Sequence, residues 1–268
     1  MCKIVLNDSD KRYKDITKNI AAQLKSVLGN LYGYFIDTGK RLIDYKAMKR
    51  SMNYIVYKDL SKKLSGFDPS TLKTDNEKKA FWINIYNGLI IHGVIELDIK
   101  DSVKEVLNFS ARIGYNIGGA FISANDIEHG ILRGHTPDTC RKSGPLSFFK
   151  KRPKLGVERF DSRIHFALVC ASNSSPPVEF YDSDKIDEQL DAAARSFIRR
   201  EGLSIDRKES VIYLLQIFKW YARDFGLNTD ELLRYIFRYA DESDREYYQK
   251  NRASLSIKYQ PYNWNLNK

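Results

Sequence analysis

The sequence has few of the residues that would indicate a disulfide framework, a zinc site or a membrane span. Its 268 residues include three cysteines (Cys2, Cys140 and Cys170) and four histidines. An odd, sparse set of cysteines does not form a disulfide framework, and no Cys-x-x-Cys or Cys/His spacing indicates zinc. No apolar run approaches the length of a transmembrane helix. We therefore expect neither a metal site nor a membrane-spanning segment.

A signal peptide is also missing from the start of the sequence. The segment 1–6 is too short for the apolar part of such a peptide. A leader could already have been removed, so a cytoplasmic location and a mature secreted form both remain open. We expect a soluble protein in either case.

Apolar and basic residues are abundant. The hydrophobic fraction is 43%, with 17 Tyr and 14 Phe, which can fill a sizeable core and argues against disorder. The 44 Lys and Arg exceed the 34 Asp and Glu, giving a net charge of +10. The segment 141–163 alone contains eight basic and two acidic residues, a net charge of +6. This basic loop could recruit an acidic partner. No RNA- or DNA-binding signature accompanies it, which argues against nucleic acid and favours a solvated loop.

The periodicity of apolar residues predicts a mainly helical chain with a few strands. A Thr74–Glu77 pair has the spacing of a helix N-terminal capping box, and the helix after it is the most apolar. Gly114, Gly118 and Gly119, between residues 109 and 121, indicate a hairpin or a bent ribbon. The run 164–170 is apolar throughout and predicts a buried strand. The remaining expected elements are amphipathic helices within 10–65, helices at 184–200 and 229–239, a strand at 211–215, a long loop at 134–162 and an extended tail at 257–266.

These elements predict an α+β fold without internal repeats or low-complexity linkers. We expect an N-terminal helical region, residues 1–74, packed on a core formed by residues 75–268.

His165 is the strongest candidate for chemistry among the four histidines. It is the only polar side chain inside the predicted strand 164–170, and a buried imidazole needs hydrogen-bond partners. A structural histidine bonded to the backbone is the competing interpretation. His92 lies in the apolar helix and is expected in the core. His129 follows Glu128, and adjacent helical positions point in different directions, so these two are not expected to share one site.

Several motifs, in a fixed order, resemble those of the DUF547 family. They are Phe81-Trp-Ile-Asn-Ile-Tyr-Asn87, Ser123-x-Asn-Asp-Ile-Glu-His-Gly-Ile-Leu-Arg133, Arg163-Ile-His-Phe-Ala-Leu-Val-Cys170, Ser174-x-Pro176, Ile217-Phe-Lys-Trp-Tyr221 and Tyr262-x-Trp-x-Leu-Asn267. The resemblance runs from about residue 75 to the C-terminus. It implies a papain-like or transglutaminase-like core with an N-terminal helical subdomain. It also implies a cysteine peptidase-like hydrolase or acyltransferase that acts on a peptide or protein substrate without a cofactor.

The resemblance also assigns a catalytic triad. Glu128 matches the family glutamate, His165 matches the histidine, and the family cysteine falls at Ser175. In such a triad the histidine is the base, the carboxylate orients it, and residue 175 is the nucleophile. Cys170 is the weaker candidate, because five residues of strict strand alternation would place it on the face opposite His165.

Serine at position 175 departs from the family pattern and leaves three explanations open. The serine could be an engineered replacement of the nucleophilic cysteine, which we favour because the surrounding motifs are intact. It could also belong to a natural serine enzyme. The third explanation is a catalytically inactive binding module that recruits an acidic partner through the basic loop, residues 141–163.

Four further polar residues lie within the same motifs. Asn84, Asn87 and Asn125 could serve an oxyanion site or bind the substrate, or they could pin loops to the core. Arg133 could bind a substrate carboxylate, although an ion pair with Glu128 is the simpler interpretation.

Overall fold

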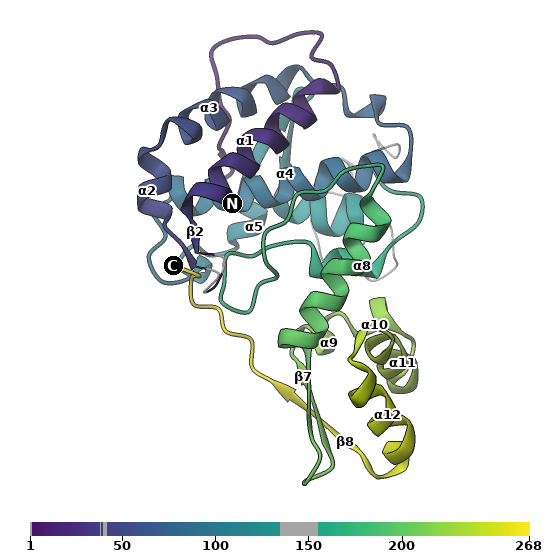
Figure 1. The fold of residues 1–268 in the computed structure, drawn as a ribbon. Helices are drawn as coiled ribbons and strands as arrows, with labels where there is room; N and C mark the ends of the chain where they lie inside the picture. Colours follow the sequence, from purple (N-terminus) through teal and green to yellow (C-terminus); the bar gives the residue numbers. More distant parts are fainter. Residues whose placement is uncertain (1, 38, 40–41, 135–154) are drawn as a thin grey trace.

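The computed structural model describes residues 2–37, 39, 42–134 and 155–268. It is a mixed helix-and-sheet structure, in agreement with the α+β class (Figure 1). The predicted loop 134–162, and with it His135, Cys140 and most of the basic loop, falls largely outside the described residues. No helix in the described ranges is both long and apolar enough to cross a membrane.

The described residues form helices of very different lengths and three small sheets, joined by irregular segments. The α-helices are α1 (Asn19–Phe35), α2 (Tyr45–Arg50), α3 (Met52–Lys62), α4 (Asp75–Glu96), α5 (Phe109–Arg112), α8 (Ile186–Phe197), α9 (Ile217–Trp220), α10 (Ala222–Phe225), α11 (Thr229–Tyr239) and α12 (Glu242–Asn251). The strands are β1 (Ile4–Val5), β2 (Ile36–Asp37), β3 (Leu42–Ile43), β4 (Ile113–Ile117), β5 (Ala120–Ser123), β6 (Leu203–Asp206), β7 (Val211–Leu215) and β8 (Ser256–Gln260).

Helix α4 is the centre of the first hydrophobic core. Its start confirms the predicted capping box: Thr74 Oγ1 accepts the N–H of Glu77, and the Glu77 carboxylate accepts the N–H of Thr74. Nearly every side chain of α4 is buried, because α1, α2 and the β4–β5 hairpin pack around it. The division of the chain at residue 74 stays a prediction.

The predicted hairpin is confirmed as β4–β5, with Ile117 paired to Ala120. Gly118 and Gly119 form its two-residue turn, and both have positive φ, +58° and +78°. This left-handed backbone is accessible to glycine at little cost, which explains two adjacent glycines at the turn. β1 extends the same sheet by pairing in parallel with β4.

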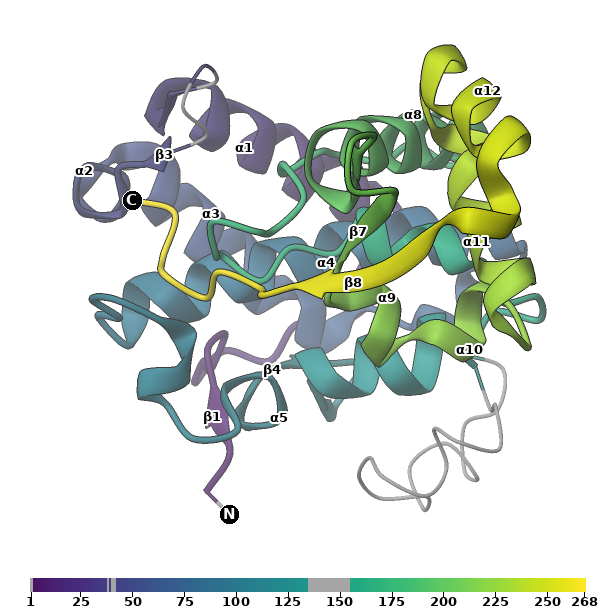
Figure 2. The ribbon, with the colours of Figure 1, turned by 90° about the horizontal axis from the view of Figure 1, so that it is seen from below.

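The N-terminal half of α8 packs on the first core, and its C-terminal half packs on a second hydrophobic core. It contains the sheet β6–β7–β8 and the helices α9 to α12 (Figure 1). β7 pairs antiparallel with β6 and parallel with β8. After β8, the C-terminal tail, residues 261–268, crosses from this sheet to the N-terminal helices (Figure 2). There the Ile43 N–H donates to the Asn267 carbonyl at 2.9 Å.

The predicted strand at 164–170 is wrong. Residues Ser162–Phe166 form a 3-10 helix, η6, whose first turn is capped by the Asp161 carboxylate. Ile164 packs into the first core and Phe166 into the second, so this apolar run is buried on both sides without pairing in a sheet. A short buried helix and a buried strand have the same apolar pattern, which is why the sequence did not separate them. His165 therefore lies where the two cores meet.

His92 is a core residue, as the sequence indicated. Its ring is 0% exposed, and its Nδ1 lies 2.9 Å from the Tyr115 hydroxyl, while Nε2 has no partner among the described residues. Burial lowers the pKa of His92 from 6.5 to about 4. The native state therefore binds this proton less readily than the unfolded chain does.

We expect this histidine to make the protein less stable in acid. As the pH falls from 6.5 to 4, the unfolded chain gains a proton that folded His92 excludes, which lowers the free energy of unfolding by up to about 3 kcal/mol. Urea denaturation at pH 7 and pH 4.5 would measure the loss. His92→Phe should remove much of it, leaving the part due to His165, whose pKa is lowered in the same direction. Equal losses in both proteins would contradict the prediction.

Candidate active site

His165 is hydrogen-bonded to a carboxylate that the sequence did not single out. Its Nε2 lies 2.7 Å from Asp224 Oδ2, and both side chains are almost fully buried. A carboxylate can only accept, so Nε2 carries the proton and donates it to Asp224. Neutral His165 then has its lone pair on Nδ1, which makes no hydrogen bond to any described residue.

Arg133 holds Asp224 from its other side. Its Nε donates to Asp224 Oδ2 at 2.7 Å, and its Nη2 donates to Oδ1 at 2.9 Å. The guanidinium also packs over the Tyr221 ring, 5.1 Å from the ring centroid. The expected ion pair between Arg133 and Glu128 is therefore wrong, because the bidentate partner of Arg133 is Asp224. Arg133 fixes the carboxylate that orients His165.

Burial and charge set the protonation of this pair. Burial lowers the pKa of His165 below its usual value, against the raising effect of the Asp224 hydrogen bond. Burial would raise the pKa of Asp224, but hydrogen bonds from His165 and Arg133 lower it overall. The resulting state at neutral pH is an ionised carboxylate beside a neutral imidazole. This is the state in which a histidine acts as a base.

Glu128 lies in the same site but bonds to two tyrosines. The Tyr221 hydroxyl donates to Oε1 at 2.7 Å, and the Tyr86 hydroxyl donates to Oε2 at 3.2 Å. The Tyr221 ring also packs against the His165 ring, with centroids 4.1 Å apart. Burial would raise the pKa of Glu128, but Coulombic interactions with His129 and His165 and the Tyr221 hydrogen bond lower it overall. Tyr221 therefore lies between Glu128 and His165, and Glu128 is not hydrogen-bonded to either imidazole nitrogen.

His129 shares the site with Glu128, contrary to expectation. The two residues belong to a π-helix, η4 (Asp126–Leu132), whose wide turn changes the direction of successive side chains relative to an α-helix. Arg133 Nη1 donates to His129 Nδ1 at 2.9 Å, and His129 Nε2 lies 3.7 Å from Glu128 Oε1. The wrong assumption was that this segment is a regular α-helix.

A cavity of about 560 Å³ lies beside His165, Glu128 and His129. Its polar lining includes Glu128, His129, His165, Cys170 and Tyr221, and most of the remaining lining is apolar or aromatic. This volume falls in the range of small-molecule and peptide-residue sites. Among the described residues, no group of three or more histidine, cysteine or acidic side chains is arranged to hold a metal ion.

Cys170 lines this cavity, whereas Ser175 does not. The Cys170 Sγ lies 3.0 Å from the Tyr262 hydroxyl and 3.0 Å from Ser172 Oγ. Ser175 is 5% exposed, and its hydroxyl accepts the backbone N–H of Cys170 at 2.9 Å. The alternation argument against Cys170 fails, because the segment from His165 to Cys170 is not a strand.

The asparagines of the motifs do not line the cavity. Asn84 makes a paired set of hydrogen bonds with the backbone of Tyr181, both 2.9 Å. Asn87 donates to the Ala167 carbonyl at 3.0 Å and accepts the Val169 N–H at 3.1 Å, which pins the segment between His165 and Cys170 to α4. Asn125 precedes the π-helix η4 and is not part of the cavity lining.

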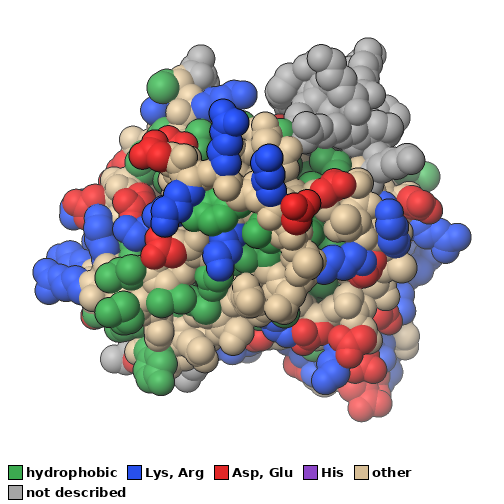
Figure 3. Space-filling model, turned by 90° about the horizontal axis from the view of Figure 1, so that it is seen from above, with side chains coloured by type: hydrophobic (Ala, Val, Ile, Leu, Met, Phe, Trp, Pro, Cys, Tyr) green, Lys and Arg blue, Asp and Glu red, His purple; other side chains and the backbone are tan. Residues whose placement is uncertain are grey.

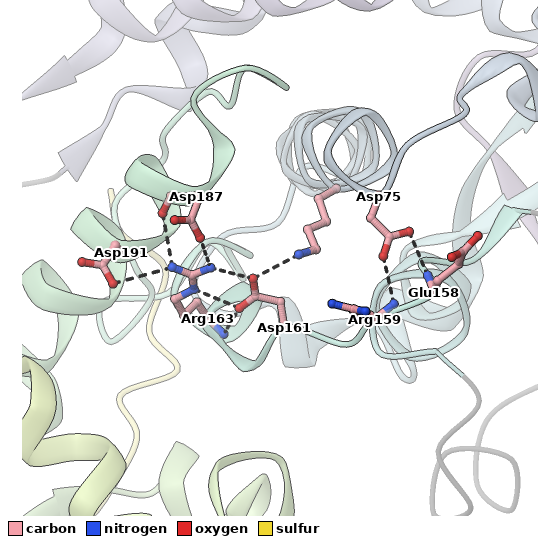
Figure 4. Close-up of polar contacts among 8 residues, drawn as sticks. Asp75, Glu158, Arg159, Asp161, Arg163, Asp187 and Asp191 are labelled. Atoms are coloured by element: carbon pink, nitrogen blue, oxygen red, sulfur yellow. Dashed lines mark hydrogen bonds and ion pairs between the residues drawn. The ribbon is translucent and has the colours of Figure 1, made fainter.

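An ion-pair network anchors the turn that carries His165 (Figure 4). Arg163 pairs with Asp161 and Asp187, and Lys79 of α4 pairs with Asp161 at 3.1 Å. Arg163 therefore ties η6 to α8, and its charge is compensated within the fold. Asp75 at the start of α4 accepts the backbone N–H groups of residues 158 and 159, at 2.8 and 2.9 Å.

Basic and acidic side chains are interspersed on the face shown in Figure 3, with apolar side chains between them. No continuous basic surface is visible there. Arg163 is the only basic residue of the segment 141–163 that forms an ion pair among the described residues, and it faces its acidic partners rather than solvent.

Residues 69–198 match the family model described as "Protein of unknown function, DUF547". This segment is a DUF547 domain. The matched segment contains α4, the β4–β5 hairpin, Glu128, His165 and Cys170, and it ends before Asp224. No curated protein and no solved structure matches this chain.

Asp224 is the residue of this candidate site that the sequence did not indicate. It lies three residues after the family-like motif Ile217–Tyr221, in the short helix α10. A single acidic residue in a sequence with 34 Asp and Glu carries little signal by itself. The available clue was the aromatic surroundings of Asp224, between Trp220 and Phe225, because a carboxylate must find a partner when it is buried.

Proposed function

We propose that this DUF547 protein is a thiol hydrolase or acyltransferase that acts on a peptide or isopeptide bond. His165 is the general base, and Asp224 orients it. The observation that carries the proposal is the 2.7 Å hydrogen bond from His165 Nε2 to Asp224, in a cavity that also exposes a cysteine thiol. A carboxylate that fixes the tautomer of a histidine is the logic of the Ser-His-Asp triad, here with a thiol in place of the hydroxyl. A papain-like or transglutaminase-like core is part of the same proposal.

Cys170 is the nucleophile in this proposal, in place of residue 175. A thiol near a histidine base is far more reactive at neutral pH than a serine hydroxyl. His165 Nδ1 takes the thiol proton, and the thiolate attacks the carbonyl carbon of the substrate. The C–N bond then breaks, and the leaving amine takes the proton from the imidazolium. Water releases the acyl group as an acid, or an acceptor amine releases it as a new amide.

Ser175 supports the loop in this proposal, because its hydroxyl accepts the N–H of Cys170. Serine at position 175 also favours the competing proposal, a catalytically inactive binding module, if residue 175 is the nucleophile in the family. Restoring the thiol by Ser175→Cys separates the two.

We expect iodoacetamide to alkylate Cys170 faster than the exposed Cys2, because His165 can take the proton of the Cys170 thiol. In His165→Ala, alkylation of Cys170 should be at least about tenfold slower. Peptide mass spectrometry after timed labelling would give both rates in one sample, with Cys2 as the internal control. Ser175→Cys should leave the Cys170 rate unchanged.

Two results would contradict this assignment. If Cys170 reacts no faster than Cys2 and does not respond to His165, Cys170 is not the nucleophile. If the thiol introduced at position 175 shows the His165-dependent reactivity instead, the nucleophile is at 175 and the protein with Ser175 is inactive.

A further inference from the structure

Three aromatic side chains form one wall of the cavity beside Cys170. Trp220 is in α9, and Tyr262 and Trp264 are in the C-terminal tail (Figure 2). Their ring centroids lie 5.3 Å apart for Trp220 and Tyr262, 4.7 Å for Tyr262 and Trp264, and 5.7 Å for Trp220 and Trp264. We name these three residues the aromatic wall. Trp220 remains 44% exposed although it lines a cavity, so the wall has apolar surface to cover.

The two ends of the aromatic wall contact chemically different groups. One end touches the thiol, because the Tyr262 hydroxyl lies 3.0 Å from Cys170 Sγ. The other end carries a cation, because Lys104 Nζ lies 4.3 Å from the centroid of the Trp264 ring. The cavity therefore runs from a nucleophile, along aromatic rings, to an exposed lysine.

Lys104 has no acidic partner among the described residues. Its neighbour Glu105 accepts three backbone N–H groups, from residues 100 to 102, so that carboxylate is already engaged. The negative charge of Glu128, on the cavity side near His165, is bonded to Tyr86 and Tyr221. The outer end of the cavity thus offers an uncompensated positive charge to a ligand.

We propose that the aromatic wall selects a peptide-type acyl group with an aromatic or large aliphatic side chain, preceded by an acidic residue. This substrate class rests on the proposed function, since it places the reacting carbonyl at Cys170. The apolar side chain packs on Trp220 and Tyr262, and the acidic group one residue further from the carbonyl reaches Lys104. Aromatic surface favours such a side chain through burial of apolar area and through ring–ring contacts.

Binding of acetyl-Asp-Phe-amide to the Cys170→Ala variant tests this proposal without any acyl transfer. The chain has three tryptophans; Trp82 is fully buried in the core, and the other two belong to the wall, so tryptophan fluorescence reports on this cavity. Acetyl-Asp-Ala-amide should bind about ten- to a hundredfold more weakly, because the ring no longer covers the wall. Trp264→Ala should weaken binding of the Phe peptide by about tenfold, measured by calorimetry, since one fluorophore is lost.

The charge preference is tested by a swap. The Asp-Phe peptide should bind about three- to fivefold more tightly than acetyl-Lys-Phe-amide, and Lys104→Glu should reverse this order. Lys208→Glu, an exposed lysine in the turn between β6 and β7, makes the same change of net charge and should leave the order intact. A reversed preference requires a folded protein, so misfolding cannot imitate it.

Equal affinities for the Phe and Ala peptides would overturn the substrate class, and so would an order of Asp and Lys peptides that Lys104→Glu leaves unchanged. These results are independent of the thiol chemistry. Selective binding without His165-dependent labelling would remove the catalytic proposal and keep the ligand class. Labelling that depends on His165, with no peptide selectivity, would remove the ligand class alone.

Discussion

Replacing Asp224 by asparagine is expected to lower the free energy of unfolding by about 3 kcal/mol and to suppress the reactivity of Cys170. The stability loss follows because Arg133, whose side chain is 12% exposed, would keep its charge without a carboxylate partner. Removing one partner of a buried ion pair typically costs about 3–5 kcal/mol, and we take the lower end because both groups retain some exposure. Urea denaturation would measure the loss.

The loss of reactivity has a separate cause. An asparagine can present its amide NH₂ or its carbonyl to His165 and no longer requires the proton to stay on Nε2. The Nδ1 lone pair is then not reserved for the thiol, and a wrong tautomer of this kind costs catalysis by orders of magnitude in related triads. We expect the His165-dependent part of Cys170 alkylation to disappear.

The double variant Asp224→Asn/Arg133→Met distinguishes the two effects. It removes the unpaired charge, so much of the stability should return, while the reactivity of Cys170 should stay low. If stability and reactivity return together, Asp224 acts only through folding. If Asp224→Asn changes neither, the hydrogen bond at His165 does not have the role given to it here.

Leu266→Ala is expected to destabilise the protein by about 2–5 kcal/mol, the range for a leucine truncated in a packed core. Leu266 is 5% exposed and belongs to the first core, although only two residues follow it in the sequence. Leu227→Ala is the matched control, since Leu227 is 88% exposed and should tolerate the change within about 0.5 kcal/mol. Urea denaturation of both variants measures the difference.

The tail also holds the segment that carries Cys170. The Asn173 N–H donates to the Asn265 carbonyl at 2.8 Å, and the Asn267 N–H donates to the Ala171 carbonyl at 3.2 Å. Loss of the Leu266 anchor should therefore increase amide exchange in residues 171–175 as well as in the tail. A tail that exchanges faster while residues 171–175 keep their protection would show that the tail is not what holds this loop.

Local pattern was sufficient for the elements whose structure depends on neighbours in sequence. The capping box at Thr74, the glycine turn at Gly118 and Gly119, and the amphipathic helices at α8 and α11 were all predicted and are present. Each depends on interactions within a few residues, so a single sequence contains the necessary information. The segment 164–170 failed because its burial comes from two separate cores, which a run of apolar residues cannot distinguish from a sheet.

The sequence by itself indicated the DUF547 domain, the α+β class and the central buried helix, and it predicted a role for His165. Tertiary structure alone decided which carboxylate bonds to that histidine and which side chains share its cavity. Asp224 is 59 residues from His165, Arg133 is 91 residues from Asp224, and Tyr262 is 92 residues from Cys170. Such contacts arise when packed helices and a crossing tail bring distant segments together, and spacing along one sequence does not encode these distances. The chemistry of this site therefore depends on partners that only the folded chain selects.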